Sequence, residues 1–272
     1  MYSNATPKRM TGFIKATLAI LGMFCLMINA VVAQQYVNGN LSTGANSSNG
    51  QAAPAGFTWS EVQTGNTNAG FGANIAAGLT LADDFTVNVA TWTVTKMTFF
   101  AYSTNYSGAA SPFNDLRLQI FNTDPSVGTP TPIFGDLTTN RLTSSSSAGM
   151  YRIFTATPGT TRQIWKLEAN INVVLPPGTY WVEWQTGVGT GITSNFSPSS
   201  TVVGTTTQPG NNAKQHDLTA NSWSAVADGT TIPNNFQDFP FIINYGTNAC
   251  TGTPDPGNTI SSVNSICPNT PF

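Results

Sequence analysis

Charged side chains are scarce in this chain. Only 8% of its 272 residues are Asp, Glu, Lys or Arg, against about 25% in an average soluble protein. The surface must therefore be made polar mainly by Ser, Thr, Asn and Gln. Intrinsic disorder combines few apolar residues with a high net charge, whereas here 40% of residues are hydrophobic and 11% are aromatic. The composition predicts a folded chain with a packed core.

Basic residues are few and dispersed. Three of the ten, Lys8, Arg9 and Lys15, precede residue 34, whereas all twelve acidic residues follow it. Residues 34–272 therefore carry seven basic and twelve acidic side chains, a formal net charge of −5 (7 − 12). Nucleic acids and anionic membranes are recognised by clustered Lys and Arg, so we expect neither as a partner.

Histidine and cysteine are nearly absent. His216 is the only histidine, and no Gly-x-Ser-x-Gly motif accompanies it. A serine or cysteine hydrolase and a common zinc site therefore lack the residues they need. We interpret His216 as a surface or strand-edge residue and expect no catalytic site. Of the three cysteines, Cys250 and Cys267 follow residue 33, and export would permit a disulfide between them. Their pairing stays open.

Residues 1–33 have the three parts of a secretory signal peptide. A basic start is followed by an apolar stretch at 16–28 and by small side chains before Gln34. The apolar run is shorter than the ~20 residues that span a bilayer, although a membrane anchor of the same shape is the alternative. We expect a protein that is secreted or held on the outer cell surface, with no membrane span after cleavage.

Strand-forming residues dominate the rest of the chain, and no stretch has the period of an amphipathic helix. Thr, Val, Ile and aromatic residues recur in short runs separated by Gly, Pro, Asn and Ser. The pattern predicts an all-β, antiparallel β-sandwich of jelly-roll type over residues 57–247. Residues 34–56 are expected to be loosely ordered, and residues 248–272 to form a flexible C-terminal tail. The expected strands lie at 57–62, 85–89, 92–102, 116–120, 150–155, 164–175, 180–184, 213–218, around Trp223 and at 239–245.

The clearest period-two pattern lies in residues 164–175, where Trp165, Leu167 and the alternate residues after them share one face. Pro176, Pro177 and Gly178 then break the strand, and residues 180–184 resume the alternation. Pro and Gly favour a tight reversal, so the two strands are predicted to form a hairpin.

Tryptophan and one glutamate supply the candidate ligand-binding residues. Trp59, Trp181 and Trp223 are the tryptophans expected to be exposed, and such rings can stack on sugars. Glu183 lies between aromatic residues, an arrangement typical of a sugar-contacting strand. The alternative is that Trp184 belongs to the core and Glu183 points outward without a role.

Paired aspartates supply a candidate calcium site. Asp83 and Asp84 open an expected strand, and Asp238 precedes another. Calcium takes six to eight oxygen ligands from irregular loops, so these three carboxylates could share one ion. Alternatively, the aspartates cap a turn and accept hydrogen bonds from nearby amides.

Several motifs, taken in order, resemble a known extracellular domain. They are Leu81–Val87 (LADDFTV), residues 92–102, Phe134–Arg141 (FGDLTTNR) and Leu175–Trp181 (LPPGTYW). Over residues 57–246 the chain is similar to a jelly-roll-like domain near the start of secreted surface proteins of Bacteroidetes-type bacteria. The resemblance carries no established reaction to named residues.

The tail adds a second resemblance. Cys250–Pro254 (CTGTP), Pro256–Thr259 (PGNT) and Ile266–Pro268 (ICP) are similar to the lead-in to immunoglobulin-like repeats of such proteins. In those repeats a cysteine pairs with one much further along the chain. The resemblance implies that residues 248–272 are a linker and the truncated start of a following domain, in which Cys267 awaits a distant partner.

These features predict a non-catalytic extracellular β-sandwich in a larger surface protein, used for adhesion or for contact with a carbohydrate, another ligand or a surface protein. Two alternatives stay open. The domain could be an accessory to an extracellular carbohydrate-active enzyme, or a structural surface element without a ligand.

Overall fold

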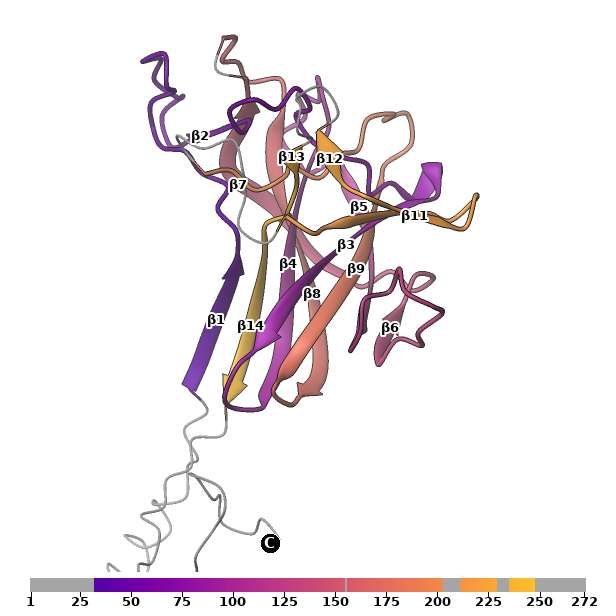
Figure 1. Ribbon diagram of the computed structural model, residues 1–272. Helices are drawn as coiled ribbons and strands as arrows, with labels where there is room; N and C mark the ends of the chain where they lie inside the picture. Colours follow the sequence, from indigo (N-terminus) through magenta and orange to yellow (C-terminus); the bar gives the residue numbers. More distant parts are fainter. Residues whose placement is uncertain (1–31, 155, 203–210, 229–234, 248–272) are drawn as a thin grey trace, which may run out of the picture. The chain divides into compact units, whose positions relative to one another are not determined.

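Two six-stranded sheets face each other across one hydrophobic core (Figure 1). The structure is a computed structural model that describes residues 32–154, 156–202, 211–228 and 235–247. The predictions for the signal peptide before residue 32, for the tail and for Cys250 and Cys267 lie outside these residues. The all-β sandwich is confirmed.

The first sheet has the order β1-β14-β4-β8-β7-β2. Its neighbours with a described register are antiparallel except for β2 and β7, which run parallel. The strands are β1 (Val32–Asn38), β14 (Phe241–Thr247), β4 (Trp92–Tyr102), β8 (Gln163–Leu175), β7 (Leu142–Ile153) and β2 (Thr58–Glu61).

The second sheet has the order β11-β10-β3-β9-β5-β6 and is antiparallel throughout. Its strands are β11 (Ser222–Ala225), β10 (Lys214–Asp217), β3 (Leu79–Val87), β9 (Gly178–Val188), β5 (Phe113–Phe121) and β6 (Phe134–Asp136). A small ribbon pairs β12 (Ala227–Asp228) with β13 (Asn235–Phe236), and a 3-10 turn, η1, spans Ile75–Ala77. Among the described residues, no helix is long and apolar enough to cross a membrane.

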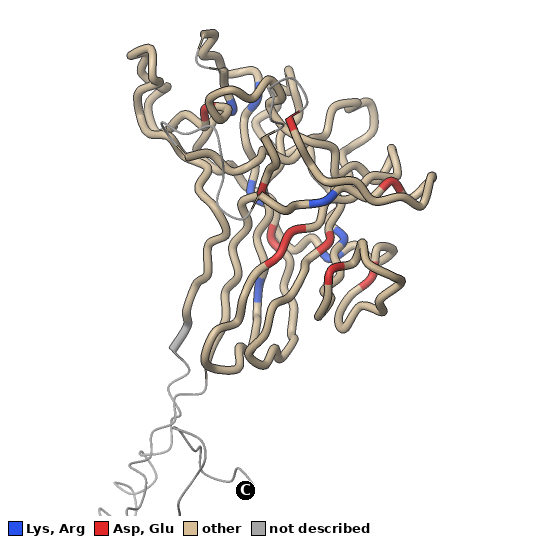
Figure 2. Tube along the Cα trace, viewed as in Figure 1, with Lys and Arg blue, Asp and Glu red and all other residues tan. Residues whose placement is uncertain are grey.

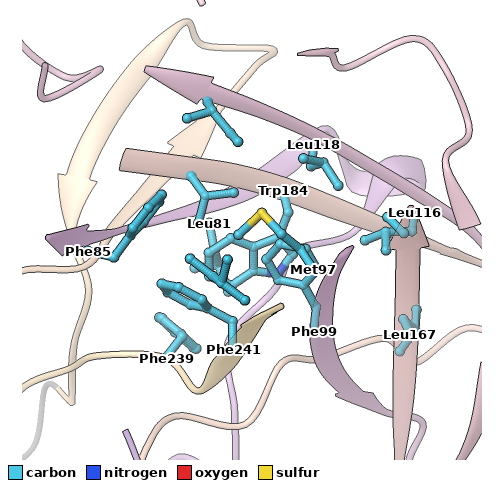
Figure 3. Close-up of a cluster of buried hydrophobic side chains, with 14 of the residues drawn as sticks. Leu81, Phe85, Met97, Phe99, Leu116, Leu118, Leu167, Trp184, Phe239 and Phe241 are labelled. Atoms are coloured by element: carbon cyan, nitrogen blue, oxygen red, sulfur yellow. The ribbon is translucent and has the colours of Figure 1, made fainter. Parts of the chain in front are cut away.

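Alternating residues from both sheets fill the core. Met97, Phe99 and Phe241 come from the first sheet and meet Leu81 and Trp184 of the second (Figure 3). The rings of Phe99 and Trp184 stack with centroids 5.0 Å apart. Because strand side chains alternate between faces, every inward residue of the second sheet leaves its chain neighbours on the outer face.

The predicted hairpin between residues 164–175 and 180–184 is wrong. β8 pairs with β4 and β7 in the first sheet, whereas β9 pairs with β3 and β5 in the second. The turn at Pro176–Gly178 therefore carries the chain from one sheet to the other. The reason is burial: both strands have an apolar face, and placing them in opposite sheets buries both faces in the same core.

The expected loose order of residues 34–56 also needs correction. β1 begins at Val32 and adjoins β14, and Gly44 bridges to Trp59 further along. Tyr36 anchors β1, since its ring packs against Phe85, Trp92 and Phe241. Tyr36 is a single large inward side chain, and one residue gives no period-two alternation from which a strand could be predicted.

Arg152 of β7 is a fully buried cation at one end of the first sheet, with no exposed surface. Its guanidinium donates to the carbonyl oxygen of Ala69 (2.8 Å), to Ser60 Oγ (3.0 Å) and to Ser199 Oγ (3.3 Å). Burial lowers its pKa to about 10, so the side chain is still charged at neutral pH. Arg152 thus ties β2 and two connections to β7.

Arg152→Met is expected to lower the free energy of unfolding by on the order of 3 kcal/mol, because several buried acceptors lose their donor at about 1–3 kcal/mol each while the charge burial is relieved. Urea denaturation checks this. Arg162→Met, at a half-buried arginine that stacks on Phe154, is the control and should cost less than about 1 kcal/mol. Equal losses in the two variants would contradict the assignment.

Candidate functional site

The outer face of the second sheet brings polar side chains from four strands together. Glu183 of β9 lies opposite Gln119 of β5, and His216 of β10 lies opposite both Thr80 of β3 and Trp223 of β11. Opposite residues of an antiparallel pair share a face. The register of the sheet therefore converts residues far apart in sequence into one cluster.

Glu183 is the centre of this cluster. Its side chain is only 1% exposed. Oε1 accepts hydrogen bonds from Thr80 Oγ1 (2.6 Å) and contacts His216 Nδ1 (3.2 Å), and Oε2 accepts one from Gln119 Nε2 (2.6 Å). A carboxylate has about four acceptor positions, so these three contacts from described residues leave one acceptor position on Oε2.

His216 is held in one orientation by two contacts. Nδ1 of the ring lies 3.2 Å from Glu183 Oε1. The imidazole also stacks on the indole of Trp223, with centroids 4.2 Å apart and planes 14° apart. Nε2 is buried and has no hydrogen-bond partner within the described part of the chain. His216 is therefore a structural partner of Glu183 and Trp223, which its interpretation as a strand-edge residue did not anticipate.

A pocket of about 480 Å³ opens above Glu183 and His216, a size within the ~300–1,000 Å³ usual for small-ligand sites. Gln119 and Trp223 line it from the sheet, and the loop between β5 and β6 supplies the opposite wall. The lining residues from that loop are Pro125, Ser126, Gly128, Thr129 and Pro130.

Lys214 fastens that loop to the sheet. Its Nζ lies 2.7 Å from Asp124 Oδ2 and 2.6 Å from Ser126 Oγ, and 5.6 Å from the centroid of the Trp181 ring. Asp124 in turn accepts a hydrogen bond from the backbone N–H of Ser126 (2.9 Å), which closes a turn of the Asx type. One side chain of β10 thereby positions the pocket wall.

The candidate tryptophans do not all reach this site. Trp223 lines the pocket, and Trp181 lies beneath it in a small apolar cluster with Ala82 and Phe121. Trp181 is buried rather than exposed. Trp59 is on the other sheet, 1% exposed, and its Nε1 donates to the carbonyl of Gln51 (2.8 Å). The expectation of an exposed Trp59 is wrong, because the bridged segment 44–52 covers it.

The three aspartates do not form the predicted cation cluster. Among the described residues no group of three His, Cys, Asp or Glu side chains could hold a metal ion. Asp83 points inward and accepts hydrogen bonds from the backbone N–H groups of Phe239 (2.7 Å) and Asp84 (2.9 Å). Asp238 accepts one from the N–H of Asn212 (3.0 Å). Asp83 and Asp238 thus accept hydrogen bonds from backbone amides, as the alternative interpretation expects. The described residues give no support to a calcium site.

Burial sets the protonation of this aspartate pair. It raises the pKa of Asp83 well above its usual range, and the charge of Asp238 adds to the effect. Burial likewise raises the pKa of Asp238 to about 6. Both carboxyls therefore hold a proton in the folded chain at pH values where an unfolded aspartate has lost it.

Sequence reasoning missed Thr80, Gln119 and the wall loop, and it gave His216 no role. The alternation of Leu118 and Ile120 does put Gln119 on the outer face. Nothing in the sequence says which strands are neighbours, however, and so nothing shows that Gln119 meets Glu183.

Comparisons with known proteins add no family assignment: no protein-family model matches the chain, and no curated protein matches it. The resemblance to the surface-protein domain stays a prediction from the motifs.

Lys214→Met should loosen the pocket wall without unfolding the sheet, because it removes the charge and keeps the stem over Trp181. Exposed ion pairs contribute up to about 1 kcal/mol, so amide exchange in residues 124–130 is expected to rise roughly fivefold. Hydrogen exchange read by mass spectrometry measures this. Lys96→Met, which breaks the Lys96–Glu168 pair on the first sheet, is the control. Unchanged exchange in the loop would refute the clamp.

Asp238→Asn should flatten the dependence of stability on pH. An unfolded aspartate ionises near pH 4, whereas folded Asp238 ionises near pH 6. The free energy of unfolding of the natural chain therefore falls as pH rises from about 4 to 6, by about 1–2 kcal/mol from this group after allowance for its partial exposure.

The amide keeps the bond from Asn212 and has no charge to bury, so the variant should lose less stability across that range. Chemical denaturation at pH 4.5 and 7 gives the comparison. Asp136→Asn is the control: hydrogen bonds from Thr138 lower the pKa of Asp136, so its effect lies below this range. A slope in Asp238→Asn equal to that of the natural chain would exclude Asp238 as the source.

Proposed function

We propose that this protein is a secreted or cell-surface, non-catalytic β-sandwich module that contacts its ligand through the pocket of Glu183, Gln119, His216 and Trp223. It would serve adhesion or carbohydrate contact within a larger surface protein. The signal-peptide pattern of residues 1–33 supports the location. The observation that carries the proposal is the buried Glu183 carboxylate beneath a pocket, held by Thr80, Gln119 and His216.

A buried, fully oriented polar group beneath a cavity supports binding. Burying a carboxylate is costly unless it is hydrogen-bonded, and a core of apolar residues would have stabilised the sheet more simply. Polar networks that persist at such a cost are common where a ligand is recognised. Trp223 adds an aromatic surface at the rim, the usual companion of a few placed polar groups in ligand sites.

The same geometry argues for contact rather than hydrolysis. Glycoside hydrolysis uses two carboxyl groups about 5–10 Å apart on either side of the bond. Among the described residues that line the pocket, Glu183 is the one carboxylate. Its oxygens already accept hydrogen bonds from Thr80 and Gln119, which hold the side chain in one orientation.

Glycan arrays followed by calorimetry test the function. We expect the protein to bind at least one glycan class, and Glu183→Gln and Trp223→Ala each to weaken that binding about tenfold or more, since each removes part of the recognition surface. Glu168→Gln on the first sheet is the matched control and should bind normally. Thermal melting of every variant separates lost binding from lost folding.

Two results would overturn the proposal. Binding that survives both pocket substitutions in folded protein would place the contact elsewhere. Cleavage of the bound glycan by the purified protein would contradict the non-catalytic assignment.

A further inference from the structure

The charges around the pocket select against anionic ligands. Among the described lining residues there is no lysine or arginine, and Glu183 contributes a negative charge at the base. The cations nearest in the sheet are already committed. Lys214 pairs with Asp124, and Arg117 pairs with Asp115 and donates to the carbonyl of Leu137. An acidic ligand would meet a buried negative charge without a positive partner.

Apart from Glu183 and His216, the lining residues are uncharged and offer two kinds of surface. Gln119, Ser126 and Asn221 carry amide or hydroxyl groups, which both donate and accept hydrogen bonds. Trp223 and Pro130 present apolar surface in the same pocket. A pyranose ring has the matching division, with hydroxyls at its edge and C–H groups on its face.

The indole of Trp223 is already held in one orientation and can serve as the apolar surface of the pocket. Its stack on His216, which is itself anchored to Glu183, restricts the indole before any ligand arrives. A side chain that is already ordered costs little entropy on binding. The anchored indole is therefore a rigid aromatic surface at the rim of the pocket.

We propose that the ligand of this pocket is an uncharged sugar ring, which packs its C–H face against Trp223 and directs hydroxyls toward Gln119 and the free acceptor position of Glu183. This rests on the proposed function, which it narrows from a ligand of any kind to a neutral glycan. Acidic sugars are excluded by charge. An ammonium group would be attracted to Glu183, but burying it beside this carboxylate costs the desolvation of the cation, so amino sugars are the competing ligand class that the test includes.

Matched sugars test the inference on the natural protein. Neutral disaccharides of glucose, galactose and mannose are compared with counterparts in which one ring is a uronate or a 2-amino sugar. Calorimetry measures affinity, and the indole N–H resonance of Trp223, assigned by its loss in Trp223→Phe, reports contact. We expect at least one neutral disaccharide to bind tenfold or more tightly than its uronate counterpart, and no less tightly than its amino-sugar counterpart. Its affinity should change little between low and high salt, because no charge is screened.

Variants separate stacking from charge. Trp223→Phe keeps an aromatic ring and should retain affinity within a few-fold, whereas Trp223→Ala should lose it. Glu183→Gln, confirmed folded by melting, should reduce the ratio between the affinity for the neutral sugar and the affinity for its uronate counterpart. Should that variant fail to fold, the comparison of neutral and acidic sugars on the natural protein still decides the point.

The outcomes separate this inference from the proposed function. Tighter binding of a uronate or an amino sugar at Trp223 would overturn the neutral-sugar inference and leave the contact function standing. A non-carbohydrate ligand that shifts the Trp223 resonance would do the same. If no sugar shifts that resonance and the glycan arrays are also blank, both proposals fail.

Discussion

The two-residue alternation of the second sheet is the constraint on which both the core and the site depend. Trp184 must point inward to complete the stack with Phe99, and so Glu183 must point outward. The same requirement turns Leu118 inward and Gln119 outward. Because antiparallel pairing fixes which residues are opposite, the site cannot shift along β9 without carrying the core with it.

The few charges of this chain are used in an unusual way. A protein with only 22 charged residues (10 + 12) would be expected to expose them for solubility, and Figure 2 shows how sparse they are along the trace. Yet Arg152, Glu183 and Asp228 are buried, each bonded to neutral groups. Asp228, for example, accepts hydrogen bonds from the backbone N–H groups of Thr67 and Asn68. The buried charged side chains of Arg152 and Asp228 thus hold segments between strands in place through hydrogen bonds.

Sequence predicted the local structure better than the pairing. The alternation in residues 164–175 located β8, and the Pro-Pro-Gly break located its end, because both signals depend on neighbouring residues alone. The partner of β8 was missed, since burial of two apolar faces across the sandwich outweighed the local preference for a reversal. Trp59 shows the same limit: it was expected to be exposed, but segment 44–52, which no local sequence pattern links to it, bridges to it and covers it. Trp223 and Glu183 were recognisable singly as candidates, whereas their link through His216 depends on the register of β3, β9, β10 and β11.

The wall of the pocket belongs to a connection and not to a strand. Residues 122–133 join β5 to β6, Val127 at the tip is largely exposed, and Gly128 has a φ of +71° that favours glycine. Among the described residues, the hydrogen bonds that join this loop to the sheet are the backbone bond of Ile133 to Ile120 and the Lys214 contacts, and Pro125 of the loop is buried. Substitutions and length changes in this loop would therefore leave the hydrophobic core untouched. The fold thus offers a pocket wall that evolution can revise independently of stability, so that the proposed ligand could differ between proteins with the same sandwich.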